Sequence, residues 1–91
     1  MTDSVNIREL AFGIMLEVTE KGQYSHLVLR AVLEKHQYLE KGERAFLTRL
    51  TEGTIQRMIE LDYIIDLFSK IKAAKMKPVI RNILRLGVYQ L

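Results

Sequence analysis

The sequence has no cysteine and a single proline among its 91 residues. The absence of cysteine excludes a disulfide framework, a thiolate nucleophile and a cysteine-ligated metal within this chain. No apolar run approaches the ~20 residues that a membrane-spanning helix needs. The N-terminal residues MTDSVNIREL show no basic region followed by an apolar run. We therefore expect a cytoplasmic protein without a secretory leader or a membrane segment.

Residue types that carry catalysis are also sparse. The two histidines, His26 and His36, do not have the spacing of metal ligands on one helix, and we interpret both as surface residues. The five glycines form neither a dinucleotide-binding fingerprint nor a P-loop. Carboxylate pairs such as Asp62 and Asp66 have a helical spacing that is typical of a solvated helix face. The chain alone therefore does not look like an enzyme, and we expect neither a metal nor a cofactor in it.

Positive charge is concentrated at one end of the chain. Residues 70–91 hold six of the 14 basic residues and no acid, whereas residues 1–69 hold the other eight and all 11 acids. The formal charges of the two parts are therefore +6 and −3. Such an asymmetry indicates a polyanion or another acidic partner, and a solvated helix flank is the alternative interpretation.

Hydrophobic residues make up 48% of the chain, which favours a folded domain, and they recur at helical spacings of three and four. We predict an all-α protein, a compact bundle of about five helices. The first helix carries an apolar stripe through Ile7–Val18 and ends near Gly22, a suitable residue to follow a helix end. Ser25 is the expected N-cap of the second helix.

The third and fourth helices are expected to meet near residues 61–62. The third helix carries apolar residues as far as Met58 and Leu61, and Gly53 lies inside it. Because glycine costs up to ~1 kcal/mol in a helix relative to alanine, we expect another helix to approach closely there. Asp62 is the expected cap of the fourth helix, which extends to Ile71.

The fifth helix is expected to begin at Pro78, which suits the first helical turn. Tyr89 falls on its narrow polar side, beside Arg81 and Arg85. Well over half of the circumference is covered by the apolar residues Val79, Ile80, Ile83, Leu84, Leu86, Val88 and Leu91. A helix that is apolar nearly all round belongs in the middle of a bundle, and the four preceding helices can cover only one side of it. We therefore expect an exposed apolar face and further helices beyond this chain.

Three segments resemble the NusB-type all-helical RNA-binding domain. They are NIRELA (6–11), ERAFLTRLTEGTIQRMIELDYII (43–65) and ILRLGVYQL (83–91), in the family's order across essentially the whole chain, 1–91. In one branch the domain is a free-standing transcription antitermination factor that begins with a run of arginines, where this chain has only Arg8. In the other branch it is the N-terminal domain of the ribosomal RNA small-subunit cytosine-C5 methyltransferase, which NIRELA and LGVYQL resemble more closely.

The resemblance implies an RNA-binding module that positions ribosomal RNA for a separate catalytic domain. In the methyltransferase branch that domain follows downstream, binds S-adenosylmethionine and supplies a cysteine nucleophile. Methyl transfer and the cofactor are therefore implied for the parent protein only. The implied partners are ribosomal RNA, the downstream catalytic domain and, from the antitermination branch, a ribosomal protein. The resemblance also implies that further helices pack on the segment LGVYQL.

Six basic residues are the candidates for contact with RNA phosphates. Arg8 is carried by the resemblance, and the others follow from charge and spacing near the end of the chain. Lys75, Lys77 and Arg81 lie at the start of the fifth helix, where a helix N-terminus favours an anion. Arg85 is equally compatible with a packing role against a buried partner. The full set is Arg8, Lys72, Lys75, Lys77, Arg81 and Arg85.

Two other interpretations stay open at this point. A protein-docking module would use Phe12 and Leu16, which lie off the main stripe of the first helix, together with the bare apolar side of the fifth. A helix-turn-helix DNA-binding protein is less favoured, because the third helix is acidic at Glu43, Glu52 and Glu60.

Overall fold

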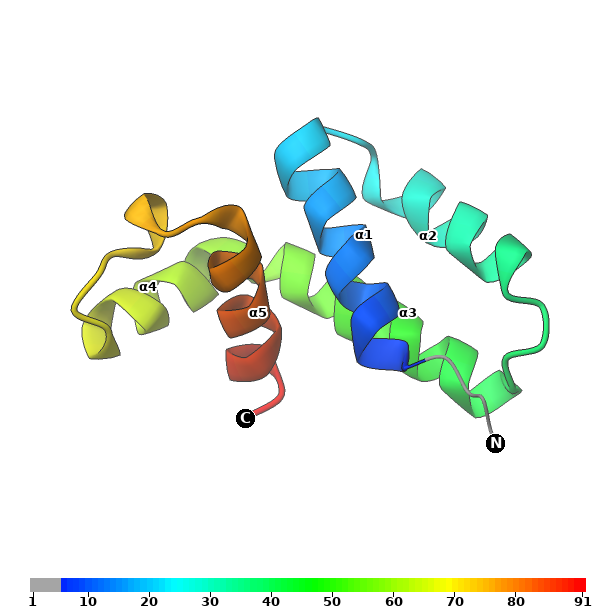
Figure 1. Ribbon diagram of the computed structural model, residues 1–91. Helices are drawn as coiled ribbons and strands as arrows, with labels where there is room; N and C mark the ends of the chain where they lie inside the picture. Colours follow the sequence, from blue (N-terminus) through cyan, green and yellow to red (C-terminus); the bar gives the residue numbers. More distant parts are fainter. Residues whose placement is uncertain (1–5) are drawn as a thin grey trace.

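The computed structural model describes residues 6–91 and contains five α-helices, with one short 3₁₀ helix before the last of them (Figure 1). The α-helices are α1 (Ile7–Lys21), α2 (Ser25–Lys35), α3 (Lys41–Gln56), α4 (Met58–Phe68) and α5 (Pro78–Tyr89), and the 3₁₀ helix is η1 (Ala73–Lys75). Residues 6–91 contain no strand, which confirms the predicted all-α bundle. The expectation of no secretory leader rests partly on residues 1–5, which lie outside the described range.

The ends of the first two helices agree only in part with the sequence prediction. Gly22 follows α1 in the left-handed region, with a φ of 70°, as predicted. The side chain of Asn6 caps the start of α1 by accepting a hydrogen bond from the backbone N–H of Arg8 at 2.9 Å. The prediction for Ser25 is wrong, because the carbonyl of Tyr24 already accepts the first helical hydrogen bonds and makes Tyr24 the N-cap.

The helices form two crossed layers. In Figure 1, α3 and α4 follow one another along the length of the molecule, α1 and α5 lie across them, and α2 runs beside α1. The core lies where α1, α2, α3 and α5 meet. Its buried residues are Ala11, Ile14, Met15, Leu29, Leu47, Leu50 and Leu86. The stripe predicted for the first helix supplies two of these residues, Ala11 and Ile14, and its Ile7, Leu10 and Val18 pack against them, whereas the buried Met15 lies beside the predicted stripe.

The junction between α3 and α4 lies at Arg57, earlier than the sequence suggests. Arg57 has a φ of −104° and a ψ of 18°, which interrupts the helix for one residue. The prediction that Asp62 caps the fourth helix is therefore wrong, since Asp62 lies inside α4, and Ile71 lies beyond the end of α4 at Phe68. Neither glycine nor proline marks the break. Its physical basis is tertiary, because the redirected α4 packs along α5.

The predicted close approach at Gly53 is confirmed. A Cβ atom at this position of α3 would overlap the phenol ring and hydroxyl of Tyr89 in α5. Tyr89 is half-buried and packs against the core. Tyr89 shares a side of α5 with Arg85, as the sequence predicts, but this side faces the core instead of solvent, because α5 crosses α3 where Gly53 leaves room for the ring.

Replacing Gly53 by alanine is expected to lower the free energy of unfolding by roughly 1–2 kcal/mol. The added methyl group collides with Tyr89, and this overpacking outweighs the helix propensity that alanine gains. Gly87→Ala is the matched control, because a Cβ there meets nothing within 4 Å. This control should stabilise the protein by up to ~1 kcal/mol. Equal urea midpoints for the two variants would contradict a close contact at Gly53.

Candidate nucleic-acid interface

The basic connection between α4 and α5, residues 69–77, carries a group of exposed lysines. Lys72, Lys75 and Lys77 are all exposed, and no carboxylate of the described residues lies within ion-pair distance of them. Lys72 precedes η1 and Lys75 ends it, with a backbone hydrogen bond of 2.9 Å from the N–H of Lys75 to the carbonyl of Lys72. Lys72 is the N-cap of η1 and has an extended backbone, so this hydrogen bond, not a helical period, keeps the two exposed lysines close together on the connection.

The N-terminus of α5 adjoins these lysines. Lys77 is the N-cap and Pro78 takes the first helical position, as predicted. The first intrahelical hydrogen bond is donated by the N–H of Arg81 to the carbonyl of Lys77 at 2.9 Å, which leaves the N–H groups of Val79 and Ile80 without a helical acceptor. An anion at this position would meet two free N–H donors, the positive end of the helix dipole and the nearby lysines.

The sequence suggests that Arg81 is open to solvent, but the structure largely buries it. Its side chain is only 17% exposed. One terminal nitrogen, Nη2, lies 3.3 Å from Oε2 of Glu20, and the other, Nη1, donates to the carbonyl of Ala73 at 3.2 Å. Arg81 therefore ties η1 and α5 to the end of α1, which favours a structural role over direct contact with phosphate.

Arg85 lies in a buried ion pair. Its Nε and Nη2 donate to the two carboxylate oxygens of Asp62, each at 2.7 Å, and its Nη1 donates to Oδ1 of Asn82 at 3.0 Å. Arg85 is 7% exposed and Asn82 is fully buried. Each of the three guanidinium nitrogens therefore donates a hydrogen bond within the protein, two of them in a bidentate pair with Asp62. Arg85 thus takes the packing role that the sequence left open. Its partner Asp62 is therefore an ion-pair residue and not the predicted helix cap, because the pairing depends on how α4 meets α5.

Arg8 stands apart from the lysines. Its Nε donates to Oε1 of Gln90 at 2.9 Å, and its guanidinium carbon lies 5.5 Å from the ring centroid of Phe46. Gln90 follows the last residue of α5, so Arg8 lies near one end of this 12-residue helix and the lysines near the other. At 1.5 Å per residue these ends are about 18 Å apart. The six candidate residues therefore do not form one patch.

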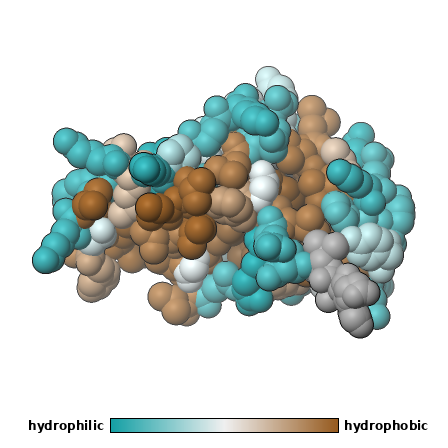
Figure 2. Space-filling model, viewed as in Figure 1, coloured by the Kyte–Doolittle hydropathy of each residue, from teal (hydrophilic) through white to brown (hydrophobic). Residues whose placement is uncertain are grey.

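The expected apolar face of α5 is present. Figure 2 shows hydrophobic side chains gathered over α4 and α5. A groove of about 440 Å³ between these helices is lined by Ile64, Ile65, Phe68, Ser69, Leu84, Val88 and Leu91. Phe68 is 86% exposed and Leu91 is fully exposed. Large exposed apolar surfaces of this kind are typical of interaction sites.

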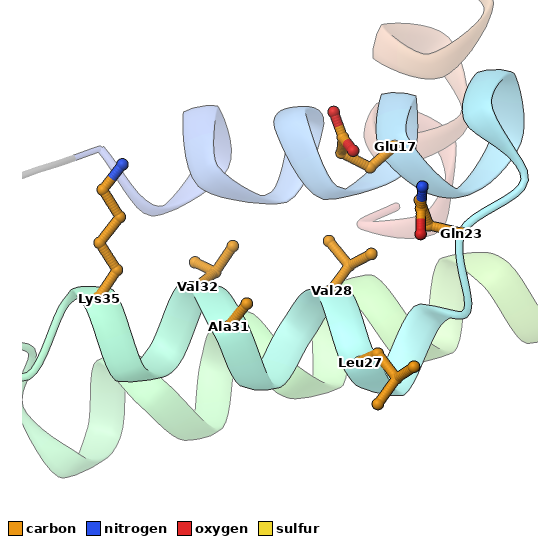
Figure 3. Close-up of a pocket in the computed structure, with 7 residues that line it drawn as sticks. All are labelled: Glu17, Gln23, Leu27, Val28, Ala31, Val32 and Lys35. Atoms are coloured by element: carbon orange, nitrogen blue, oxygen red, sulfur yellow. The ribbon is translucent and has the colours of Figure 1, made fainter.

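Two smaller grooves flank α1. The first, about 320 Å³ between α1 and α2, is shown in Figure 3, where Val28 and Val32 point from α2 toward α1 and Leu27 points away. The second, about 250 Å³ between α1 and α5, includes the half-buried Phe12 that the sequence offered as a docking residue. Neither groove brings together a set of groups that could perform acid–base or nucleophilic chemistry.

Residues 6–91 hold no cluster of three or more histidine, aspartate or glutamate side chains placed to hold a metal ion. His26 is exposed, as predicted. His36 is half-buried instead, with its Nδ1 lying 2.8 Å from the carbonyl of Val32 in the preceding turn. Within the same range, no helix is both long enough and apolar enough to cross a membrane.

The fold is that of a small all-helical domain with a basic connection before its last helix. The NusB family model matches residues 5–91, and the chain belongs to the NusB family. It is 34% identical over 86 residues to the "Probable ribosomal RNA small subunit methyltransferase B" of Bacillus subtilis, and 32% identical over 87 residues to the protein of the same name in Synechocystis. These alignments cover 94% and 96% of the chain but only 19% of each relative. No solved structure matches the chain significantly.

Proposed function

We propose that this domain binds ribosomal RNA and that Lys72, Lys75 and Lys77 supply its main phosphate contacts. The observation that carries the proposal is the placement of three exposed lysines, without carboxylate partners in residues 6–91, beside the N-terminus of α5. Each lysine that neutralises a phosphate releases condensed counterions, which is the main source of affinity in sequence-independent binding. Contacts of this kind fix the position of RNA without reading its sequence.

The finer proposal concerns the whole protein. The chain spans about a fifth of the length of the relatives named above, and their names denote ribosomal RNA methyltransferases. We infer that the domain holds small-subunit ribosomal RNA for a separate cytosine-C5 methyltransferase domain in a longer polypeptide. S-adenosylmethionine would bind in that separate domain and supply the methyl group. The role of residues 72–80 is limited to binding and orienting the RNA.

The direct test is a titration of the isotope-labelled chain with a transcript of small-subunit ribosomal RNA, followed by amide chemical shifts. We expect the largest shift changes at residues 72–80, and affinity that falls steeply as salt rises. Changes confined to the apolar groove between α4 and α5 would overturn the assignment of the RNA contact. No binding at low salt would overturn the RNA-binding function itself.

A second candidate function is protein docking, which the apolar groove between α4 and α5 favours. We propose that residues following Leu91 in a longer polypeptide cover this groove, with a ribosomal protein as the alternative occupant. Burial of a side chain such as Phe68 stabilises by about 1.5–3 kcal/mol, so a chain extended by the residues that follow in the gene should melt several degrees higher. An unchanged melting temperature would contradict docking by that segment.

A further inference from the structure

A single residue of the basic connection, Ala73, is held from two helices. Its backbone N–H donates to Oδ1 of Asp66 in α4 at 2.7 Å. Its carbonyl accepts from Nη1 of Arg81 in α5 at 3.2 Å and from the N–H of Met76 at 3.1 Å. Ala73 is also buried, with 1% of its surface exposed. Both polar groups of this residue are therefore satisfied, and η1 is anchored at its first position.

The anchor continues into α1 and α4 through a chain of hydrogen bonds. Arg81 contacts Oε2 of Glu20, and the Thr19 hydroxyl, which lies 2.8 Å from the carbonyl of Met15, is 3.1 Å from the same carboxylate oxygen. Nδ2 of the fully buried Asn82 donates to that hydroxyl at 3.0 Å, and Oδ1 of Asn82 accepts from Arg85. The chain ends at the ion pair of Arg85 with Asp62, described above. One polar network thus connects η1 with three helices.

We propose that Asp66, Glu20 and Arg81 are positioning residues that hold η1 so that Lys72 and Lys75 present their ammonium groups together to RNA. The inference rests on the proposed RNA-binding function. The physical reason is preorganisation, because a connection that is ordered in the free protein loses less conformational entropy when RNA binds. Ala73 is buried, so fixing its backbone also fixes the exposed residues that flank it, Lys72 just before η1 and Lys75 at its end.

The proposal predicts that truncating Asp66 or Glu20 weakens RNA binding, whereas simple electrostatics predicts that it tightens binding. Asp66 and Glu20 are carboxylates near a site for an anion, so removing either charge should tighten RNA binding, by about two-fold through screened Coulomb attraction. If these acids hold η1 in place, deleting the acceptor oxygen frees the connection and weakens binding. The two effects can be separated, because an amide keeps the acceptor oxygen and loses the charge.

The test compares Asp66→Ala with Asp66→Asn in the 91-residue chain. Binding of a fluorescently labelled small-subunit ribosomal RNA transcript is measured by anisotropy at several salt concentrations. We expect Asp66→Ala to bind roughly three- to ten-fold more weakly. The reason is that RNA binding must then order one or two freed side chains and their backbone. Asp66→Asn should bind as well as the parent or up to about two-fold more tightly.

Two further readouts distinguish positioning from direct contact. Because Asp66→Ala keeps every lysine, its slope of log affinity against log salt should match that of the parent. Its Lys75 and Met76 amides, which donate hydrogen bonds around η1, should exchange with solvent faster than in the parent. Glu20→Ala against Glu20→Gln repeats the comparison at an exposed helix end, so that a folding defect in Asp66→Ala does not leave the proposal untested.

Tighter binding by both alanine variants would overturn the positioning role while leaving RNA binding intact. Unchanged amide exchange in both alanine variants would overturn the anchor. A parent chain that fails to bind the transcript would overturn the proposed function, and the RNA role of the anchor with it, whatever the exchange rates show. Weaker binding by both alanine variants, with both amide variants at or above parent affinity, supports the proposal.

Discussion

The variant in which Lys72, Lys75 and Lys77 are all replaced by glutamine is expected to bind ribosomal RNA roughly ten- to hundred-fold more weakly at low salt. These lysines lose their contacts with phosphate, and three fewer counterions are released on binding. The slope of log affinity against log salt should therefore fall by about 2, near 0.7 for each single-strand contact. The measurement is fluorescence anisotropy of a labelled transcript over a range of salt concentrations.

The matched control replaces Arg30, Lys35 and Lys41, which are also exposed but lie on α2 and at the start of α3. This variant undergoes the same change of net charge, so a general effect of charge on RNA binding would appear equally in both. Both variants should keep their helical circular dichroism. Equal losses of affinity in the two triple variants would show that RNA senses only net charge, and the assignment of the interface to residues 72–77 would fall.

Replacing Asp62 by alanine is expected to lower the free energy of unfolding by roughly 2–4 kcal/mol. The change leaves the guanidinium of Arg85 buried without its carboxylate, and an uncompensated buried charge is strongly destabilising. The lower part of the usual range applies, because the side chain of Asp62 is 30% exposed and water can reach part of the site. For a domain of this size the melting temperature should drop by roughly 10–20 °C.

The informative control for this ion pair removes both partners. The double variant Asp62→Leu with Arg85→Met keeps apolar volume in place of the charges and should recover much of the lost stability. Its thermal unfolding should lie well above that of Asp62→Ala. A single variant Asp62→Ala that melts with the parent would show that Arg85 finds other partners or solvent, and that the pair does not hold α4 to α5.

The candidate interface could be located only in part from the sequence. The absence of acids among residues 70–91 pointed to the correct segment, because net charge along a chain does not depend on folding. The sequence alone could not separate the basic residues that face solvent from those that pair with acids inside the fold. Arg81 and Arg85 have the same charge as the lysines, yet their donors are directed at Glu20 and Asp62, acids that come from α1 and α4. The positions of those acids depend on helix packing.

The sequence by itself determined the all-α class, the stripe of α1, the glycine after it and the start of α5 at Pro78. These features follow from local rules, since side-chain period, left-handed backbone and proline geometry act within a few residues. Only the tertiary structure decided the break at Arg57, the approach of Tyr89 to Gly53 and the separation of Arg8 from the lysines. Each of these depends on where α5 packs against the other helices, because such tertiary contacts outweigh the weak local preference of any one residue.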